Sequence, residues 1–248
     1  MWKILCKFLL AAFCILFCFV VQTVYQTYKV EEMRYKLSEI KNIEKKASEA
    51  DEKKGESISL AEINPDYAGW LRVLGTKVDY PVVLGQTNEK YLHRDFYGQD
   101  SAAGTLFFDE TTELSQKGNR IIYGHKMKDN TMFGSLDKFK DKDFFKDNGY
   151  VKLEDINGTY AYRIFAAMVL PGNSDSESFI DIQKWNNNLD EEETEEMLQT
   201  IKDRASIYQE PLKTQDDTFL FLVTCDYSRD NGRLVLVARR ITTTGGDE

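Results

Sequence analysis

The sequence predicts a mainly β domain, either a closed barrel or a sandwich, behind an N-terminal membrane helix. Runs rich in β-branched and aromatic residues recur along most of the chain, with Gly, Pro and Asn-Gly between them. About seven or eight such runs with closely spaced turns are typical of barrels and sandwiches. An uncharged apolar stretch precedes them near the N-terminus and indicates a segment that enters a bilayer.

The apolar stretch is expected to form an uncleaved signal anchor within residues 1–27. Residues 8–21 carry no charge, and the run widens to 4–24 if Lys7 snorkels, close to the roughly 20 residues that span a bilayer. A cleaved signal peptide is the alternative, but no small-x-small cleavage site follows the run. Lys3 and Lys7 favour a cytoplasmic N-terminus, so we expect a single-pass membrane protein with an extracellular remainder.

A highly charged segment follows and is expected to form a helical spacer over residues 28–57. Its apolar residues recur at spacings of three and four, which predicts a helix with a narrow apolar stripe. These residues are Val30, Met33, Leu37, Ile40 and Ile43. The helix could hold the domain away from the membrane or pack on it. The globular domain is expected over 58–241 and a flexible tail over 242–248.

Strands are expected within the domain wherever β-branched and aromatic residues cluster between turn residues. These runs lie near 78–84, 105–108, 119–123, 150–154, 159–170, 218–224 and 233–241. Asn157-Gly158 predicts a hairpin with a primed turn between two of them. Helices are expected at 64–71, 132–139, 142–148 and 189–205. The last is the longest, and Asp190 with an acidic first turn favours its start.

Composition excludes several classes of function. The 248 residues suffice for one domain of roughly 150–200 residues plus an anchor. The formal net charge of −9 argues against nucleic acid as the main partner, because phosphate binding needs a basic face. The chain has two histidines and four cysteines, and Cys6, Cys14 and Cys18 lie in or beside the anchor. A His/Cys metal site is therefore not expected.

Cys225 is the cysteine that remains outside the anchor, at the end of the apolar run 218–224. A single thiol in an exported domain indicates an intermolecular bridge or a reactive nucleophile. A strand end that meets a loop can hold such a group rigidly and still expose it. Neighbouring cations would stabilise the thiolate and make it a useful nucleophile. An ordinary buried cysteine is the alternative.

His125 and Arg233 are the candidate partners of this thiol. His125 follows an apolar run, and its imidazole could take the thiol proton and later protonate a departing amine. Arg233 opens the last strand, eight residues after Cys225. If the two strands pair antiparallel, its guanidinium returns to the thiol and could stabilise an oxyanion. Both residues could instead be structural, and His93, in a charged stretch, is expected to be a surface residue without a role.

These motifs resemble those of the sortase family, and of class B sortases in particular. The signature Thr-Leu-x-Thr-Cys appears at 221–225 as Phe-Leu-Val-Thr-Cys, with Phe221 in place of the first Thr. The class B pattern around the histidine is similar to Ile-Tyr-Gly-His-Lys-Met-Lys-Asp at 122–129. Asp226 and Tyr227 follow the cysteine, where pilus-building class C enzymes usually carry Pro. Further similar stretches are Met132-Phe133-Gly134, Trp70, 79–82 and 104–109, and the resemblance covers roughly 60–241.

The resemblance implies a closed eight-stranded β-barrel with peripheral helices. It also implies a membrane-anchored extracellular cysteine transpeptidase that cleaves a C-terminal sorting signal, related to Leu-Pro-x-Thr-Gly or Asn-Pro-Gln-Thr-Asn, after its Thr. By this resemblance Cys225 would attack the Thr carbonyl, Arg233 would stabilise the oxyanion and His125 would protonate the leaving amine. The substrate groove would be lined by Asn88, Leu92 and Thr224.

The implied partners are a surface protein that bears the sorting signal and an amine of peptidoglycan or of a lipid-linked precursor. No cofactor and no metal are implied. Three alternatives stay open at this point: a cysteine peptidase in which water resolves the thioester, a pilus-assembling sortase, and a non-catalytic anchored binding domain. Neither the exact sorting motif nor the acceptor amine follows from the residues.

Overall fold

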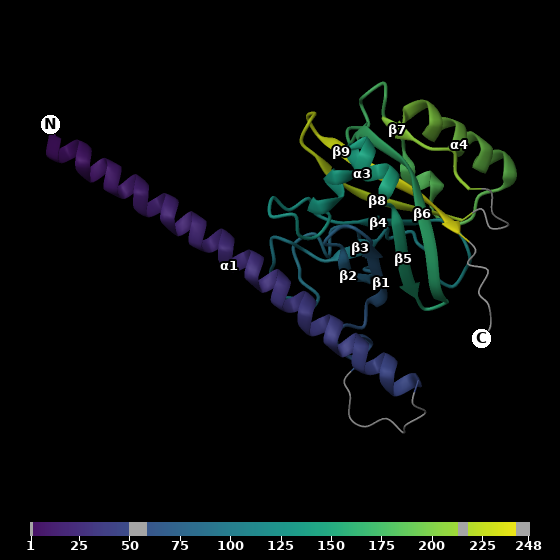
Figure 1. Cartoon of the computed structure of the whole chain (residues 1–248), viewed down its shortest axis with the longest axis horizontal. Helices are drawn as coiled ribbons and strands as arrows, with labels where there is room; N and C mark the ends of the chain where they lie inside the picture. The colour runs from purple at the N-terminus through teal and green to yellow at the C-terminus, as the bar shows by residue number, and fades with distance from the viewer. Residues whose placement is uncertain (1, 50–58, 213–217, 242–248) are drawn as a thin grey trace.

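The computed structural model describes residues 2–49, 59–212 and 218–241. A long helix, α1 (Trp2–Glu49), runs along one side of a β domain, and its N-terminal part projects far beyond the domain (Figure 1). The expected tail and most of the expected junction between spacer and domain lie outside the described residues. The division of α1 at residue 27 stays a prediction, because one uninterrupted helix covers both sides of it.

The domain is a closed β-barrel of eight strands, as the resemblance implied, and is not a sandwich. The strands follow each other around the barrel in the order β5-β1-β2-β3-β4-β8-β9-β6, and pairing of β5 with β6 closes it. The strand pairs β2–β3 and β4–β8 are parallel. The strands are β1 (Tyr67–Val73), β2 (Asp79–Val83), β3 (Leu106–Phe108), β4 (Arg120–Tyr123), β5 (Tyr150–Asp155), β6 (Gly158–Pro171), β8 (Phe219–Asp226) and β9 (Gly232–Ile241). A short ninth strand, β7 (Ile207–Tyr208), pairs with β6.

Strand β8 is buried on both of its faces. Leu220 and Leu222 belong to the core that fills the barrel, whereas Phe221 and Val223 belong to a second core on the outer surface. The outer core includes Met197 of the helix α4 (Glu191–Arg204), which covers this side of the barrel (Figure 1). Burial on both faces explains why the strand reads as a continuous apolar run. It also assigns odd-numbered residues of β8 to the outside and even-numbered residues to the inside.

The expected helices at 132–139, 142–148 and 189–205 are confirmed. They correspond to the 3₁₀ helix η1 (Gly134–Lys140), to α3 (Lys142–Asp147) and to α4. Helix α4 begins as expected at Asp190, which accepts a hydrogen bond from the Glu193 amide at 2.8 Å. Two further short helices are α2 (Leu60–Ile63) and η2 (Ile182–Trp185).

Two local expectations are wrong. The segment 64–71 is not helical: α2 ends at Ile63, and β1 follows, hydrogen-bonded to β2 on one side and β5 on the other. Pairing with both neighbours overrides the local pattern. The β5–β6 hairpin exists, but its turn is not primed, because Asp155 pairs with Gly158 and the positive φ of 140° falls on Gly158.

Helix α1 packs on the domain, which decides between the two possibilities for the spacer. Val30 and Leu37 are buried, and Leu37 packs in a cluster with Leu60 and Trp70. Lys41 adds an ion pair to Glu154 at 2.8 Å, and its ammonium lies 4.6 Å from the centre of the Trp70 ring. The apolar stripe of the charged segment is therefore the docking face of the helix.

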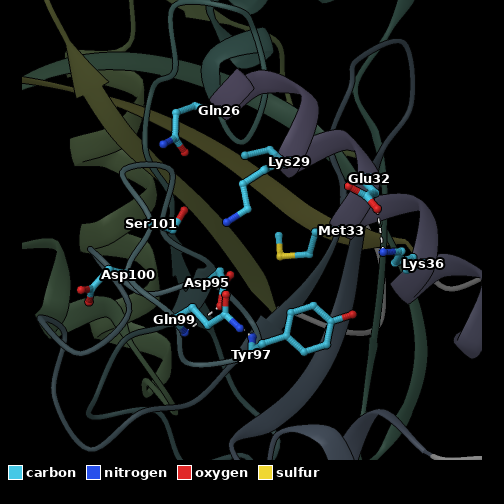
Figure 2. Close-up of a pocket in the computed structure, with 11 residues that line it drawn as sticks. Gln26, Lys29, Glu32, Met33, Lys36, Asp95, Tyr97, Gln99, Asp100 and Ser101 are labelled. Atoms are coloured by element: carbon cyan, nitrogen blue, oxygen red, sulfur yellow. Dashed lines mark hydrogen bonds and ion pairs between the residues drawn. The ribbon is translucent and has the colours of Figure 1, made fainter. Parts of the chain in front are cut away.

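The docked helix does not seal against the loop that leads from β2 to β3. A cavity of about 320 Å³ lies between them, with polar side chains from both sides around it (Figure 2). Lys29 and Met33 of α1 lie across it from Tyr97 and Gln99. Docking therefore rests on the apolar stripe and on Lys41 more than on this loop.

The N-terminal part of α1 meets the requirements for a membrane span. Within Cys6–Ile43 an apolar window has a mean hydropathy of 2.4, and none of it is buried against the domain. By length and composition the helix can cross a bilayer.

Candidate active site

Cys225 and Arg233 are direct cross-strand partners. Strands β8 and β9 pair antiparallel, as expected, and the register places Cys225 opposite Arg233. Both side chains lie on the outer face of the barrel, the face of Val223 and Val235. Such partners have Cβ atoms about 4.5–5.5 Å apart. Cys225 is a free thiol and is partly exposed.

The guanidinium of Arg233 is held by neutral oxygens. Its Nη1 donates to Oδ1 of Asn231 at 3.1 Å and to the carbonyl of Gly232 at 3.0 Å. Among the described residues no carboxylate lies within 4.0 Å of it. Its positive charge is therefore oriented but not neutralised, which suits a group that stabilises a developing anion.

His125 continues β4 beside β8. The parallel register pairs Tyr123 with Val223, and the amide of Gly124 donates to the Val223 carbonyl at 3.2 Å. Extended by two residues, this register aligns His125 with Cys225. Strands β4, β8 and β9 thus bring the three predicted catalytic residues to one end of the barrel, although their roles stay predictions.

The imidazole of His125 is fixed on two sides. Its Nε2 lies 2.7 Å from the carbonyl oxygen of Leu92. Because a carbonyl can only accept, Nε2 carries a hydrogen, and Nδ1 remains available for proton transfer. The ring of His93 stacks on that of His125, with centroids 5.9 Å apart. His93 is exposed, as expected, but the sequence did not reveal this contact.

The three residues predicted to line a substrate groove, Asn88, Leu92 and Thr224, have different surroundings. The amide of Asn88 donates to Asp109 at 3.1 Å, and its oxygen accepts from the amide of Glu110 at 2.9 Å, so this side chain fastens its own loop. Leu92 is partly buried and contacts His125 through its carbonyl. Thr224 points into the barrel with 3% exposure, so a groove contact from this residue would come from its backbone.

A hollow of about 160 Å³ adjoins Arg233 on the outer face. One wall comes from barrel residues and the other from the segment that leads into η2. The lining residues are Tyr123, Leu170, Pro171, Gly172, Phe179, Ile180, Asp181, Ile182, Gln183, Val223, Arg233 and Val235. We call this hollow the groove. It is mostly apolar, with one acidic and one basic side chain, which suits an uncharged peptide segment.

A buried ion cluster lies on the inner side of the same strand end. Asp226 has no exposed surface in its side chain and pairs with Lys140 and, at 3.8 Å, with Lys126. Asp137 binds both lysines, at 2.8 Å and 2.6 Å. Burial opposes ionisation of Asp226, but hydrogen bonds from Lys140 and Ser228 lower its pKa to about 2.

This ion cluster ties the residue after His125 to the residue after Cys225. The sequence shows Asp226 only as a charged residue after Cys225, and its burial was not predicted. Strand alternation is the signal that could have found it, because a residue next to an outward-facing Cys225 must face inward.

Comparison with known proteins gives a consistent result. A family model described as Sortase domain matches residues 71–241. A curated relative, Sortase B of Staphylococcus aureus, is 31% identical over 186 residues, which cover 74% of this chain and 73% of the relative. Sortase B of Listeria monocytogenes is 33% identical over 189 residues, with the same two coverages of 74% and 73%.

Solved structures agree with the barrel described above. Sortase B of Clostridium perfringens has a TM-score of 0.66 and 34% identity, over 73% of this chain and 97% of that one. A Staphylococcus aureus sortase B–substrate complex has a TM-score of 0.67 and 27% identity, over 86% and 95% of the two chains. A Streptococcus pyogenes class B sortase involved in pilus biogenesis has a TM-score of 0.62 and 30% identity, over 73% and 96%.

Proposed function

Because this chain belongs to the sortase family and its relatives are class B members, we propose that it cleaves a C-terminal sorting signal and transfers the protein to a cell-wall amine. The observation that carries the proposal is the direct pairing of Cys225 with Arg233 on the outer face of the barrel, at the edge of the groove. The signal is of the Leu-Pro-x-Thr-Gly or Asn-Pro-Gln-Thr-Asn kind.

In the first half-reaction the thiolate of Cys225 attacks the carbonyl carbon of the signal's Thr. The tetrahedral oxyanion is stabilised by the guanidinium of Arg233, which has no carboxylate partner among the described residues. As the C–N bond breaks, His125 gives its proton to the departing amine, leaving a thioester on Cys225.

In the second half-reaction an acceptor amine attacks the thioester carbonyl. His125 takes a proton from the amine, the C–S bond breaks, and a new amide links the protein to the acceptor. The acceptor belongs to peptidoglycan or to a lipid-linked precursor. Similarity to a class B sortase involved in pilus biogenesis supports a second acceptor class, an amine on another protein subunit.

The groove is the proposed site of the sorting signal. Asn88 and Leu92 line its approach, and Thr224 contributes its backbone. The support is that Asn88 and Leu92 belong to the loop that contacts His125 and that Thr224 adjoins the thiol. The apolar part of α1 anchors the enzyme by a single pass, with the catalytic domain outside the cell.

The test is to trap the thioester on the full chain in detergent. We expect mass spectrometry to find a sorting-peptide acyl group on Cys225 and, after addition of an amine acceptor, a ligated product. Cys225→Ala should abolish both, and Arg233→Ala should lower turnover by about 10²–10³-fold. A control chain in which Cys6, Cys14 and Cys18 are all Ala should keep full activity.

Retained turnover in the Cys225→Ala chain would refute cysteine catalysis. If only the free acid forms with every acceptor tried, the enzyme is a peptidase and not a transferase. If no peptide acylates the wild-type chain, the domain is a non-catalytic binding module.

A further inference from the structure

A buried carboxylate at the end of β3 gathers hydrogen bonds from separate parts of the candidate site. Asp109 has no exposed surface. Its Oδ2 accepts from the amide of Asn88 at 3.1 Å, the hydroxyl of Tyr123 at 3.1 Å and the amide of Gln183 at 2.7 Å. Its Oδ1 accepts from the backbone and hydroxyl of Thr111, at 2.9 Å and 2.6 Å. Five donors therefore converge on one side chain.

Three of these donors belong to structures that surround the proposed chemistry. Asn88 lies in the loop whose Leu92 carbonyl holds the imidazole of His125. Tyr123 lies two residues before His125 and lines the groove. Gln183 belongs to η2, the wall of the groove that faces the barrel. A single carboxylate thus connects the loop that carries Asn88 and Leu92, the end of β4 and the η2 wall of the groove, which is not part of the sheet.

The buried negative charge of Asp109 favours keeping its hydrogen-bond donors in place. Among the described residues no lysine or arginine forms an ion pair with it, so dipoles alone compensate the buried charge. Burial opposes its ionisation, yet the hydrogen bonds from Gln183, Thr111 and Asn88 hold its pKa below the usual value. Burial and the nearby Asp109 raise the pKa of Tyr123, which therefore remains a donor at neutral pH. Displacing any donor would leave a buried charge less well compensated.

We propose that Asp109 is a positioning residue of the active site. It holds the loop of Asn88 and Leu92, which contacts the imidazole of His125, in a fixed position relative to the η2 wall of the groove. It does not touch the reacting atoms and acts through Asn88, Tyr123 and Gln183. This inference rests on the proposed function, because its main consequence is for turnover of a sorting peptide. It predicts a defect in peptide binding larger than any defect in folding.

The contacts suggest two mild variants and one matched control. Asp109→Asn keeps the shape and one acceptor oxygen but removes the charge, and Gln183→Ala releases only the η2 wall. The control is Asp190→Ala, which removes a carboxylate that caps α4 near the other end of β8. The start of α4 lies beside Thr218, which directly precedes β8, in a pocket that shares no lining residue with the groove. The control therefore leaves the groove untouched.

The experiment measures kcat, KM and thermal unfolding of each full-length variant with a sorting peptide and an amine acceptor. We expect Asp109→Asn to raise KM about tenfold, and Gln183→Ala to raise it by a similar factor, with kcat changed less in the second variant. The double variant should be little worse than Asp109→Asn alone, since both changes act on the same hydrogen bond between Asp109 and Gln183. Asp190→Ala should lower the unfolding temperature without changing KM.

Three outcomes would overturn the inference. The first is an unchanged KM and kcat in Asp109→Asn. The second is a loss of activity that the Asp190→Ala control reproduces at the same loss of stability, which would make Asp109 merely structural. The third is full additivity of the effects of Asp109→Asn and Gln183→Ala on KM. Failure of the proposed function looks different, because then the wild-type chain itself forms no acyl-enzyme.

Discussion

Successive residues of β8 serve opposite faces of the barrel at the candidate site. Cys225 faces outward, to Arg233 and the groove, while Asp226 faces inward and is held by Lys140 and Lys126. The thiol therefore sits on a strand end that an internal ion cluster anchors. Removing one partner of a buried ion pair is costly because the other charge is left uncompensated.

This anchoring has a measurable pH dependence. The pKa of Asp226 is lowered from 3.8 to about 2 in the folded chain, so its contribution to stability is present above about pH 4 and is lost as the pH falls toward 2. At about 1.4 kcal/mol for each pH unit between the two values, it amounts to roughly 2 kcal/mol. We expect Asp226→Asn to lower the free energy of unfolding at pH 7 by at least this amount.

Denaturant unfolding at pH 7 and at pH 2.5 measures the effect. The difference between wild type and Asp226→Asn should shrink at the lower pH, where most of the wild-type contribution has gone. An equal difference at both pH values would contradict the assignment. Asp190→Ala, which removes an exposed cap, provides a reference whose carboxylate lies outside the cluster.

At the scale of elements, the loop after His125 closes on itself. The amide of Phe133 donates to the His125 carbonyl at 3.0 Å, and Gly134 starts η1 directly against the backbone of Met127. A Cβ on Gly134 would lie 2.2 Å from the Met127 carbonyl oxygen, far inside contact distance. This close approach gives a physical reason for the glycine in the motif that follows the histidine.

We therefore expect Gly134→Ala to displace the loop and to destabilise the chain by about 1–3 kcal/mol. Turnover should fall as well, because the displaced backbone carries His125. The control is Gly98→Asn: Gly98 has a φ of 77° with open space around it, and Asn tolerates that conformation. Thermal unfolding of both variants decides the matter, and a Gly134→Ala chain as stable as wild type would disprove the close packing.

Most elements were predictable because their cause is local. The strands β2, β3, β4, β8 and β9 follow from apolar runs, and α4 follows from Asp190 and its acidic first turn. Strand β1 was not predictable, since it is fixed by hydrogen bonds to β2 and β5 rather than by its own residues. The contacts of Asp109 were hidden for the same reason, because its donors come from three separate segments.

The pairing of Cys225 with Arg233 was predictable from a short loop between two adjacent strands. The position of His125 beside them was not a matter of spacing, because a parallel partner strand can come from anywhere in the chain. His125 was a candidate because it follows an apolar run and its imidazole could exchange a proton with the thiol, and the resemblance gave it the same role. The register of β4 with β8 now supplies the geometry.

At the scale of the whole molecule, the packing of α1 on the domain sets the position of the domain relative to the proposed membrane span. The buried Leu37 is the centre of the contact, whereas Tyr35, two residues earlier, is 66% exposed. We expect Leu37→Asp to undock the helix and Tyr35→Asp to leave it docked. Hydrogen exchange of the amides of residues 30–43 should become at least about tenfold faster in the first variant only. Equal exchange in the two variants would show that the stripe does not hold the helix.

The unbroken helix α1 also fixes the distance between the proposed bilayer span and the domain. Val24 ends the apolar run, and Thr27 already donates to Asp129 of the domain at 2.6 Å. At about 1.5 Å of rise per residue, only about 4–5 Å of helix separate the proposed bilayer span from the first contact with the domain. Because one continuous helix both forms the proposed span and packs on the domain, the catalytic domain stays close to the membrane surface. It can process only chains whose cleavage site passes through a thin layer beside the membrane, as that of a protein still held in the bilayer by its own C-terminal end would.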